Sequence, residues 1–365
     1  MIYLDANATE PVRPESVTAV SDALRITGNP SSPHGAGRAA RALLDQARRQ
    51  TAACFGASTE NCVFTSGGTE ANMLAVRGLG AGRRILIGAT EHDAVRRAPE
   101  DNAPVGTIPV SPQGVTDCGA LETLLESSDE DTLVCVMLAN NETGVISPIR
   151  DIAALCRKYG ARLHVDAVQA AGRMPVDLPE LGADSIAISG HKFGGPKGAG
   201  ALLLSGSSPA VLPPVMAGGG QERGRRGGTP ALPAIAGMAA ALEAALAEPR
   251  DLSALRDAIE TAALRSGALL CGEKTDRLGN TSALILPWMK GEAQLIALDL
   301  DGFCVSAGSA CSSGKVASSH VLEAMGFGDL AGHAIRVSLP WNVQTDIDGQ
   351  FSAAYERMAA RRRPV

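Results

Sequence analysis

Short β-rich runs that alternate with helical patterns are the feature that most constrains how this sequence can fold. Six such runs occur, at residues 62–65, 84–88, 132–138, 162–166, 185–189 and 199–204. Between most of them, as at 39–55 and 149–159, apolar residues recur at helical spacing. When strands and helices alternate along a chain, the strands usually form a mostly parallel sheet and the helices pack on its faces. We therefore predict an α/β fold with a large, mostly parallel sheet flanked by helices.

The pattern changes after an alanine-rich helical stretch that ends near residue 248. The sequence EPRD at 248–251 interrupts it, and helix and strand patterns alternate in the remainder. We expect a large domain at residues 15–248 and a smaller α+β domain at residues 249–365, to which residues 1–14 also belong.

Charge and apolar content exclude two classes of partner. The formal net charge is -6 and only 3% of residues are aromatic, so we expect no nucleic-acid partner. The most apolar stretch, 231–247, contains Pro233 and Glu243 and is shorter than the roughly 20 residues that span a bilayer, so we expect no membrane partner.

The N-terminal region and the cysteines favour a reducing compartment. An acidic residue, Asp5, occurs near the start of the sequence, before any apolar run, so we expect no secretory leader. The eight cysteines include no C-x-x-C pair, which argues against a disulfide framework or a zinc site and predicts mostly buried thiols. We therefore expect a cytoplasmic protein.

Two glycine-containing motifs lack the context that their usual functions require. Residues 35–40 (GAGRAA) fit a dinucleotide fingerprint but follow Pro33 and His34 rather than a strand, so a glycine turn that opens a helix is the better interpretation. Residues 195–198 (GPKG) lack the rest of a P-loop, and no HExxH occurs.

Polar residues follow several predicted strands, where open α/β sheets bind their ligands. The turn at 66–72 (SGGTEAN) leads into a helix whose N-terminus could hold a phosphate or could simply be capped. Asp166 ends one strand and Lys192 follows another. With six lysines against 27 arginines, a lysine at this place suggests a need for its amine, although a solvated surface lysine is the alternative. Together, the three features are the parts of a pyridoxal phosphate site.

Ten motifs in matching order resemble the cysteine desulfurases of the nitrogen-fixation and iron–sulfur-assembly type, within the class-V aminotransferase group of pyridoxal phosphate enzymes. The motifs are at 3–5 (YLD) with 8–9 (AT), 28–32 (GNPSS), 65–70 (TSGGTE), 91–92 (EH), 140–144 (NNETG), 164–167 (HVDA), 189–192 (SGHK), 218–220 (GGG) with 222–224 (ERG), 308–312 (GSACS) and 335–336 (IR). The fold implied is pyridoxal phosphate fold type I.

The resemblance implies pyridoxal 5'-phosphate as cofactor and gives roles to matching residues. The implied catalytic residues are Cys311, Lys192, which would form the Schiff base, and His92, which would stack on the ring. The other implied cofactor contacts are Gly68, Thr69, Asn141, Asp166, Gln169, Ser189, His191 and Thr229. The implied substrate contacts are Asn29, Asn141 and Arg336. Because Thr229 resembles a residue that reaches the neighbouring protomer's phosphate, a homodimer is implied.

Cys311 lies among small residues at 306–314 (SAGSACSSG), which predicts a mobile loop; an inert cysteine in a glycine-serine turn is the alternative. The implied reaction takes sulfur from L-cysteine, leaves L-alanine and forms a persulfide on Cys311. The implied partner is a sulfur acceptor such as an iron–sulfur scaffold, with which Cys311 could transiently share a cluster as a metal ligand. A selenocysteine lyase, a true aminotransferase and a non-catalytic assembly partner are the rival functions.

The sequence departs from the family pattern at three places. Glu10 follows Thr9 where the family repeats threonine, GG replaces Ser-Gly after Arg226, and 339–341 (LPW) stands where a small or polar pair is usual. None of these changes removes an implied catalytic group. The C-terminal region looks shorter than in the housekeeping iron–sulfur-assembly branch of the family, whose tail engages the scaffold protein, so the resemblance does not identify the sulfur acceptor.

Overall fold

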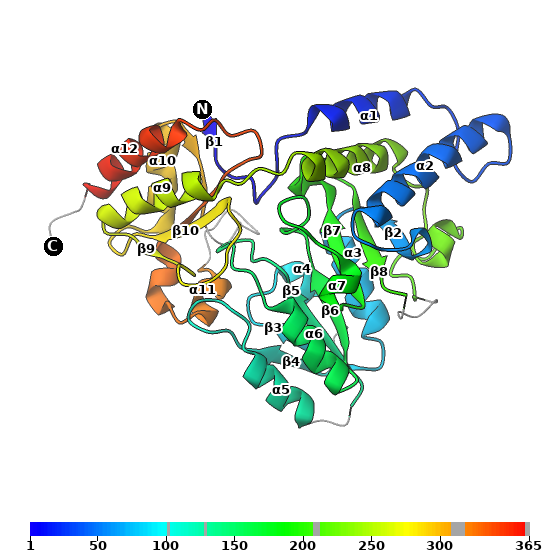
Figure 1. Ribbon diagram of the computed structural model, residues 1–365, viewed down its shortest axis with the longest axis horizontal. Coiled ribbons are helices and arrows are strands. Elements are labelled where there is room, and N and C mark those ends of the chain that lie inside the picture. The colour runs from blue at the N-terminus through cyan, green and yellow to red at the C-terminus, as the bar shows by residue number, and fades with distance from the viewer. Residues whose placement is uncertain (101–102, 128–129, 207–211, 308–317, 362–365) are drawn as a thin grey trace.

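A seven-stranded sheet forms the centre of the larger of two lobes (Figure 1). The structure is a computed structural model that describes residues 1–100, 103–127, 130–206, 212–307 and 318–361. The strands of the sheet are β2 (Cys62–Thr65), β3 (Arg84–Gly88), β4 (Val105–Ile108), β5 (Thr132–Met137), β6 (Arg162–Asp166), β7 (Ser185–Ser189) and β8 (Gly200–Leu204).

The order of the strands is β2-β8-β7-β6-β5-β3-β4. Every pair from β7 to β4 is parallel, and β8 runs antiparallel to both of its neighbours, β7 and β2. The prediction of a mostly parallel sheet is therefore confirmed. Since β8 reverses direction, β2 points the same way as β7, and its carboxyl end reaches the same edge of the sheet.

Helices cover both faces of this sheet, which is why its central strands are apolar on both sides. Leu133 and Cys135 of β5 pack in one core with α3 and α4, whereas Val134 and Val136 pack in a second core with helices of the opposite face. The helices of this lobe are α1 (Pro14–Leu24), α2 (Gly35–Ala53), α3 (Gly68–Leu79), α4 (Asp93–Arg96), α5 (Cys118–Glu126), α6 (Ile149–Lys158), α7 (Leu178–Leu181) and α8 (Leu232–Ala247).

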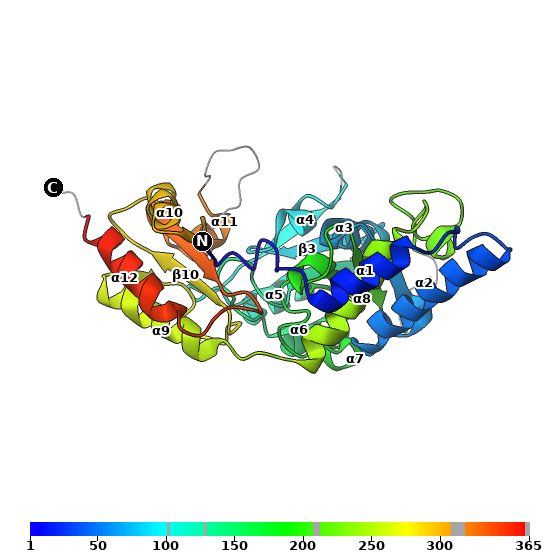
Figure 2. The ribbon, with the colours of Figure 1, turned by 90° about the horizontal axis from the view of Figure 1, so that it is seen from above.

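The alanine-rich stretch forms α8, which packs against both α1 and α2 (Figures 1 and 2). The predicted helix at 39–55 begins earlier, at Gly35, because the His34 side chain accepts a hydrogen bond from the Gly37 N–H and caps it. The predictions missed β4, an edge strand in which only Ile108 is buried. Without a second buried residue, this run lacks the apolar signal of its neighbours.

The smaller lobe contains a four-stranded antiparallel sheet in the order β12-β13-β10-β9. Its strands are β9 (Leu269–Leu270), β10 (Thr281–Ile285), β12 (Ser306–Ala307) and β13 (Ala334–Ser338), and its helices are α9 (Ser253–Arg265), α10 (Gly291–Leu300), α11 (His320–Ala324) and α12 (Ile347–Ala359). A separate core contains Phe351 and Tyr355 of α12. The two lobes lie end to end (Figure 2).

The N-terminal segment contacts both lobes. β1 (Ile2–Tyr3) pairs with β11 (Phe303–Cys304) of the small lobe, and the Ala6 N–H donates to the Ser338 carbonyl. Further along, the Glu10 N–H donates to the His191 carbonyl of the large lobe. The domain boundaries at residues 14 and 248 stay predictions, with which these contacts agree.

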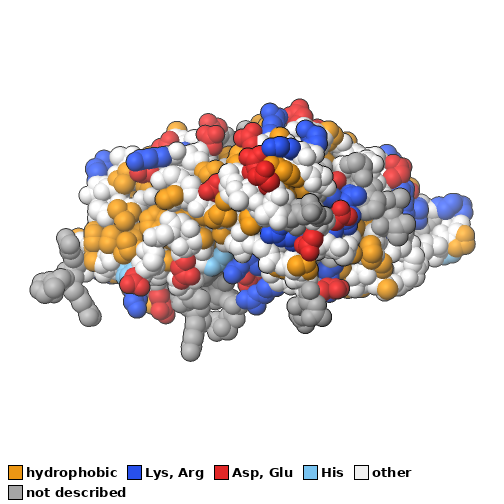
Figure 3. Space-filling view, turned by 90° about the horizontal axis from the view of Figure 1, so that it is seen from below, with side chains coloured by type: hydrophobic (Ala, Val, Ile, Leu, Met, Phe, Trp, Pro, Cys, Tyr) orange, Lys and Arg blue, Asp and Glu red, His pale blue; other side chains and the backbone are white. Residues whose placement is uncertain are grey.

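The cysteines in the described residues all carry free thiols, and Cys62, Cys135, Cys156 and Cys271 are buried. Within the same residues, no helix combines the length and the apolar content needed to cross a bilayer. On the face seen in Figure 3, basic and acidic side chains are interspersed.

Candidate active site

A cavity of about 330 Å³ lies where the carboxyl ends of the parallel strands meet the small lobe. It is lined by Asn7, Ala8, Asn72, Ala94, Met137, Ala139 and Val168 and by ten of the predicted site residues, namely Gly68, Thr69, His92, Asn141, Asp166, Gln169, Ser189, His191, Lys192 and Arg336. Residues that are far apart in the sequence therefore share one small space.

Lys192 ends the short 3-10 helix Gly190–Lys192, which directly follows β7. Its Nζ donates hydrogen bonds to the carbonyl oxygens of Asn7 and Ala8, the latter at 3.1 Å. Burial and, to a lesser degree, the nearby positive charges of Arg336 and Arg173 lower the pKa of Lys192 to about 7. An amine with this pKa is a nucleophile and a proton acceptor near neutral pH.

Asp166 is buried at the end of β6, and both of its oxygens accept hydrogen bonds. The Val168 N–H donates to Oδ1 at 2.9 Å, and the Asn72 amide donates to Oδ2 at 2.7 Å. Burial raises the pKa of Asp166, while these hydrogen bonds and the charge of Lys192 oppose that rise. The carboxylate is thereby fixed in orientation inside the cavity.

Asn72 is itself held by His164, whose Nε2 lies 2.9 Å from the Asn72 Oδ1. Burial lowers the pKa of His164 to about 3, so the ring is neutral. Because the amide oxygen can only accept, Nε2 carries the proton and Nδ1 accepts from the Ser185 hydroxyl at 2.8 Å. A chain of three hydrogen bonds thus orients Asp166 from behind.

The N-terminus of α3 opens onto the cavity. Gly67 precedes the helix at φ 154°, a conformation that favours glycine. A Cβ on Gly68 would lie 2.7 Å from the Val168 Cγ2, so only glycine allows the helix to approach so closely. The first N–H groups of a helix have no acceptor within it, and here Gly68 and Thr69 present theirs beside Ser189.

Two histidines line the cavity in neutral form. The His92 Nδ1 accepts from the Ala94 N–H at 3.0 Å and caps α4, which leaves the proton on Nε2, and burial lowers the pKa of His92. Burial also lowers the pKa of His191 to about 4, and its Nδ1 lies 3.3 Å from the Thr9 hydroxyl.

Arg336 of β13 brings a guanidinium from the small lobe to the cavity. Its terminal nitrogens donate to the Asn141 carbonyl at 3.1 Å and to the Asp5 carboxylate at 2.6 Å. Its buried Nε has no hydrogen-bond partner among the described residues. A buried guanidinium with unused donor capacity suits a carboxylate ligand.

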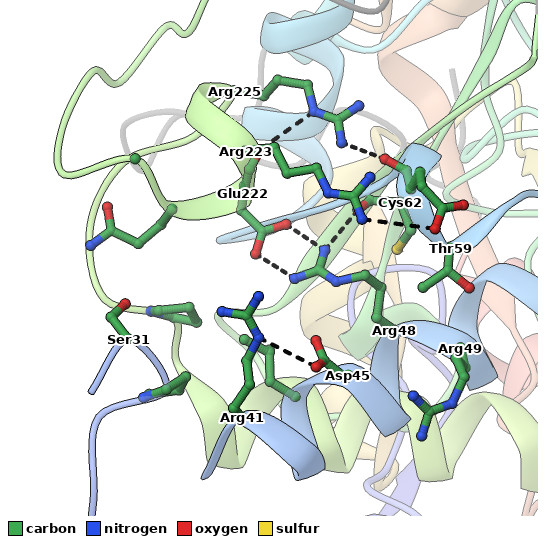
Figure 4. A pocket seen from close by; sticks show the side chains of 16 residues that line it. Ser31, Arg41, Asp45, Arg48, Arg49, Thr59, Cys62, Glu222, Arg223 and Arg225 are labelled. Carbon is green, nitrogen blue, oxygen red and sulfur yellow. Dashed lines mark hydrogen bonds and ion pairs between the residues drawn. The ribbon is translucent and has the colours of Figure 1, made fainter. Parts of the chain in front are cut away.

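Two predicted residues lie away from this cavity in the chain described. Asn29 is exposed, and its neighbours Pro30 and Ser31 line a different hollow of about 510 Å³ (Figure 4). Thr229 is also exposed and lines a small hollow with Ser66. Cys311, including its predicted role as a transient metal ligand, lies outside the described residues.

Ion pairs tie the loop that precedes Thr229 to the large lobe. The two terminal nitrogens of Arg48 donate hydrogen bonds to the two carboxylate oxygens of Glu222, at 2.6 and 2.7 Å (Figure 4). Arg226 contacts Glu70 at 2.8 Å, and Glu70 also accepts from the Ser66 N–H. The loop is therefore anchored to the turn at the N-terminus of α3.

Sequence reasoning assigned no role to Asn7, Asn72 or His164. Asn72 and His164 were within quoted motifs, and their polar side chains at apolar, buried positions are the signal that could have singled them out. The described residues contain no group of three or more His, Cys, Asp or Glu side chains arranged to hold a metal ion.

Comparisons with known proteins agree over nearly the whole chain. The aminotransferase class-V family model matches residues 2–348. A cysteine desulfurase from Cereibacter sphaeroides is 40% identical over 363 residues, which cover 95% of this chain and 93% of that protein. The structure of a NifS-like protein from Rickettsia africae matches with a TM-score of 0.91 at 34% identity, covering 98% of this chain and 99% of that one. The structure of SspA in complex with cysteine matches with a TM-score of 0.82 at 28% identity, covering 93% and 99%. This chain therefore belongs to the aminotransferase class-V family.

Proposed function

We propose that this chain is a cysteine desulfurase, which takes sulfur from L-cysteine and leaves L-alanine and a persulfide on Cys311. As a member of the aminotransferase class-V family, it is a pyridoxal phosphate-dependent enzyme. The observation that carries the proposal is the single cavity in which a lysine with a pKa of about 7 meets the buried Asp166 and Arg336. The names of its relatives support the choice of cysteine as substrate.

The residues of the cavity fit pyridoxal phosphate. The N–H groups at the start of α3, together with Ser189 and His191, would hold the phosphate, and the lack of space for a Cβ at Gly68 marks a close approach. Asp166 would contact the ring nitrogen and Lys192 would bond to the cofactor. The remaining contacts would come from His92 on the ring face, Gln169 at the phenolic oxygen and Asn141.

When bound, pyridoxal phosphate would supply an electron sink for the negative charge that develops at the substrate Cα. Arg336 binds the substrate carboxylate through its guanidinium. The Lys192 amine takes the α-proton, a task that suits a pKa near neutrality. Asp166 keeps a proton on the ring nitrogen, and Asn72 holds that carboxylate in place.

The thiolate of Cys311 then attacks the substrate sulfur. A sulfur–sulfur bond forms and the carbon–sulfur bond breaks, with its electron pair staying on the substrate carbon. That carbon, the Cβ, takes up a proton, and Lys192 returns the α-proton to the Cα. The product leaves as alanine, and Cys311 keeps the sulfur, with its hydrogen, as a persulfide. Transfer to a second thiol regenerates Cys311.

Replacing Cys311 with serine tests this step. The C311S variant should bind the cofactor and change its absorbance when cysteine is added, yet release no alanine and carry no persulfide. Mass spectrometry of the wild-type protein after cysteine should find one added sulfur on the peptide that contains Cys311. Cys304→Ser, at a partly buried position on β11, is the matched control and should keep activity.

The same variant separates the rival functions. A true aminotransferase has no use for the thiol, so full activity in C311S would refute the desulfurase. A selenocysteine lyase would keep activity on selenocysteine, because selenium leaves more readily without thiol attack. If the added sulfur were found on Cys304 or Cys271, that cysteine rather than Cys311 would be the nucleophile.

The partners belong to the same proposal. The exposed Thr229, outside its own cavity, would reach the phosphate in a second copy, which makes the enzyme a homodimer, and Asn29 would join the substrate contacts. The acceptor is a protein thiol, with an iron–sulfur scaffold as the first to test by pull-down with the persulfidated enzyme. The cytoplasm is the proposed location, since its reducing conditions keep thiols free.

A further inference from the structure

Glu10 is a buried carboxylate behind the wall of the cavity that holds Lys192. It is 5% exposed, and its main-chain N–H donates to the His191 carbonyl at 2.8 Å. Its Oε1 lies 3.2 Å from the Arg173 guanidinium, and its Oε2 accepts from the Trp341 main-chain N–H at 3.2 Å. A buried carboxylate with a guanidinium beside it is a charge pair shielded from solvent.

A chain of three hydrogen bonds links Arg173 to Lys192. Its guanidinium donates to the Gln169 Oε1 and to the Ala6 carbonyl. The Gln169 Nε2 in turn donates to the Asn7 carbonyl at 3.1 Å, which also accepts from the Lys192 Nζ. A shift of Arg173 would therefore move the carbonyl that positions the lysine.

Trp341 fixes the other side of Glu10. Its indole N–H donates to the Pro11 carbonyl at 2.7 Å, and the Arg13 guanidinium lies 4.5 Å from the centroid of its ring. The Arg13 Nε donates to the Phe193 carbonyl, next to Lys192. Two of the three departures from the family pattern, at Glu10 and at 339–341, thus contact each other at one point between the lobes.

We propose that Glu10 is a positioning residue for Lys192, which balances the charge of Arg173 and holds the Arg173–Gln169–Asn7 connection in place. The inference rests on the proposed function only in taking Lys192 as the reactive lysine. It adds to the site a residue that lies outside the cavity.

The charges around Lys192 determine in which direction its pKa should shift when Glu10 or Arg173 is replaced. Arg336 and Arg173 disfavour its ammonium form, and Asp166 and Asp5 favour it, while the neutral rings of His92 and His191 also face it. Without Glu10, the charge of Arg173 is unbalanced, so the amine should lose its proton at lower pH. Without Arg173, a positive charge is gone, so the amine should lose its proton at higher pH.

Trace acetylation of the apo-protein across a range of pH, read peptide by peptide in a mass spectrometer, measures this titration. Lys192 should titrate roughly 0.5 pH unit or more lower in Glu10→Gln and higher in Arg173→Met, whereas Glu10→Asp should stay near the wild type. Glu180→Gln is the matched control, because it removes a carboxylate from an exposed ion pair with Arg150. It should leave Lys192 unchanged.

Opposite shifts in the two variants separate charge balance from loss of structure, which would move both the same way. Equal titration in all variants, or shifts of one sign, would overturn the proposal. If Glu10→Gln does not fold, Arg173→Met and Arg173→Lys decide it, since only the former should raise the titration point. The readout needs neither cofactor nor substrate, so failure of the proposed function, which C311S tests, would leave it interpretable.

Discussion

Lys192 illustrates how a reactive side chain is made by its surroundings. The lysine is partly buried among Asn7, His191 and Arg336, and positive charges are near. Both conditions disfavour the ammonium, so the amine is available at a pH at which exposed lysines are protonated. The same conditions burden the fold, because an unfolded chain would keep that proton.

The apo-protein should therefore gain stability when Lys192 is replaced by methionine, most of all at low pH. Since the pKa of Lys192 is about 7 in the folded state, well below the 10.5 of an exposed lysine, the unfolded chain binds an extra proton between these pH values. The loss of folding stability caused by Lys192 is complete below pH 7 and disappears as the pH rises through this window. It amounts to roughly 5 kcal/mol at most, reduced by the screening that solvent in the cavity provides.

Urea unfolding of the two apo-proteins at pH 6 and pH 9.5 measures the difference. Lys197→Met, at an exposed position five residues away, serves as control and should show little dependence on pH. A difference between wild type and Lys192→Met that stays constant with pH would contradict the lowered pKa.

At the scale of single residues, the sequence was enough to predict the reactive side chains but not the side chains that hold them in place. Asp166 and Lys192 were predictable because each follows a strand, where ligands gather in open α/β sheets. The amide of Asn72 and the ring of His164 were not, because their roles depend on which elements pack together. The contact between Asn72 on α3 and His164 on β6 spans 92 residues.

Among the elements, the approach of α3 to the sheet decides whether a phosphate can be held. Gly68 lies against Val168, which follows β6, and against Ser189, the last residue of β7. The helix N-terminus can therefore point into the cavity only while position 68 has no side chain.

Gly68→Ala should weaken cofactor binding by roughly tenfold, because overpacking of this kind costs about 1–3 kcal/mol and pushes the N–H groups away from the cavity. Cofactor affinity can be measured from fluorescence or absorbance as the apo-protein is titrated. Gly35→Ala is the matched control, since Gly35 is also the first residue of a helix and its added Cβ would meet only the end of the Arg38 side chain, at 3.8 Å. Equal affinity in both variants would show that α3 adjusts freely.

The predicted elements agree best where burial is complete. The runs at 62–65, 84–88, 162–166 and 185–189 coincide with β2, β3, β6 and β7, whose residues are almost all buried. The edge strand β4 was missed because its Val105 faces solvent. The early start of α2 was missed because His34, which is not a preferred capping residue, closes its first turn.

For the whole molecule, the central question is which parts of one site come from which copy of the chain. Mixed dimers of Lys192→Ala and Thr229→Val answer it. If Thr229 serves the partner's cavity, one site of the mixed dimer carries both changes and the other is intact. Such a dimer should retain about half of the wild-type activity, measured as alanine released after tandem-tag purification.

If Thr229 served its own cavity instead, each site would carry one change, and activity would not exceed that of Thr229→Val sites. A monomeric protein by light scattering would contradict the homodimer directly. The sequence alone could place Thr229 only by resemblance, because nothing in its local pattern points to a second chain.

The antiparallel strand β8 has a consequence for how the chain acquires its fold during synthesis. β2 pairs with β8, which follows it by about 135 residues, and β1 pairs with β11, which follows much later. At ribosomal rates, β2 waits on the order of ten seconds for its neighbour, with the apolar side chains of Val63 and Phe64 uncovered. Pairings between such distant segments are slow to form. The nascent chain should therefore depend on chaperones until β8 emerges, and the segment made first should be the last to dock.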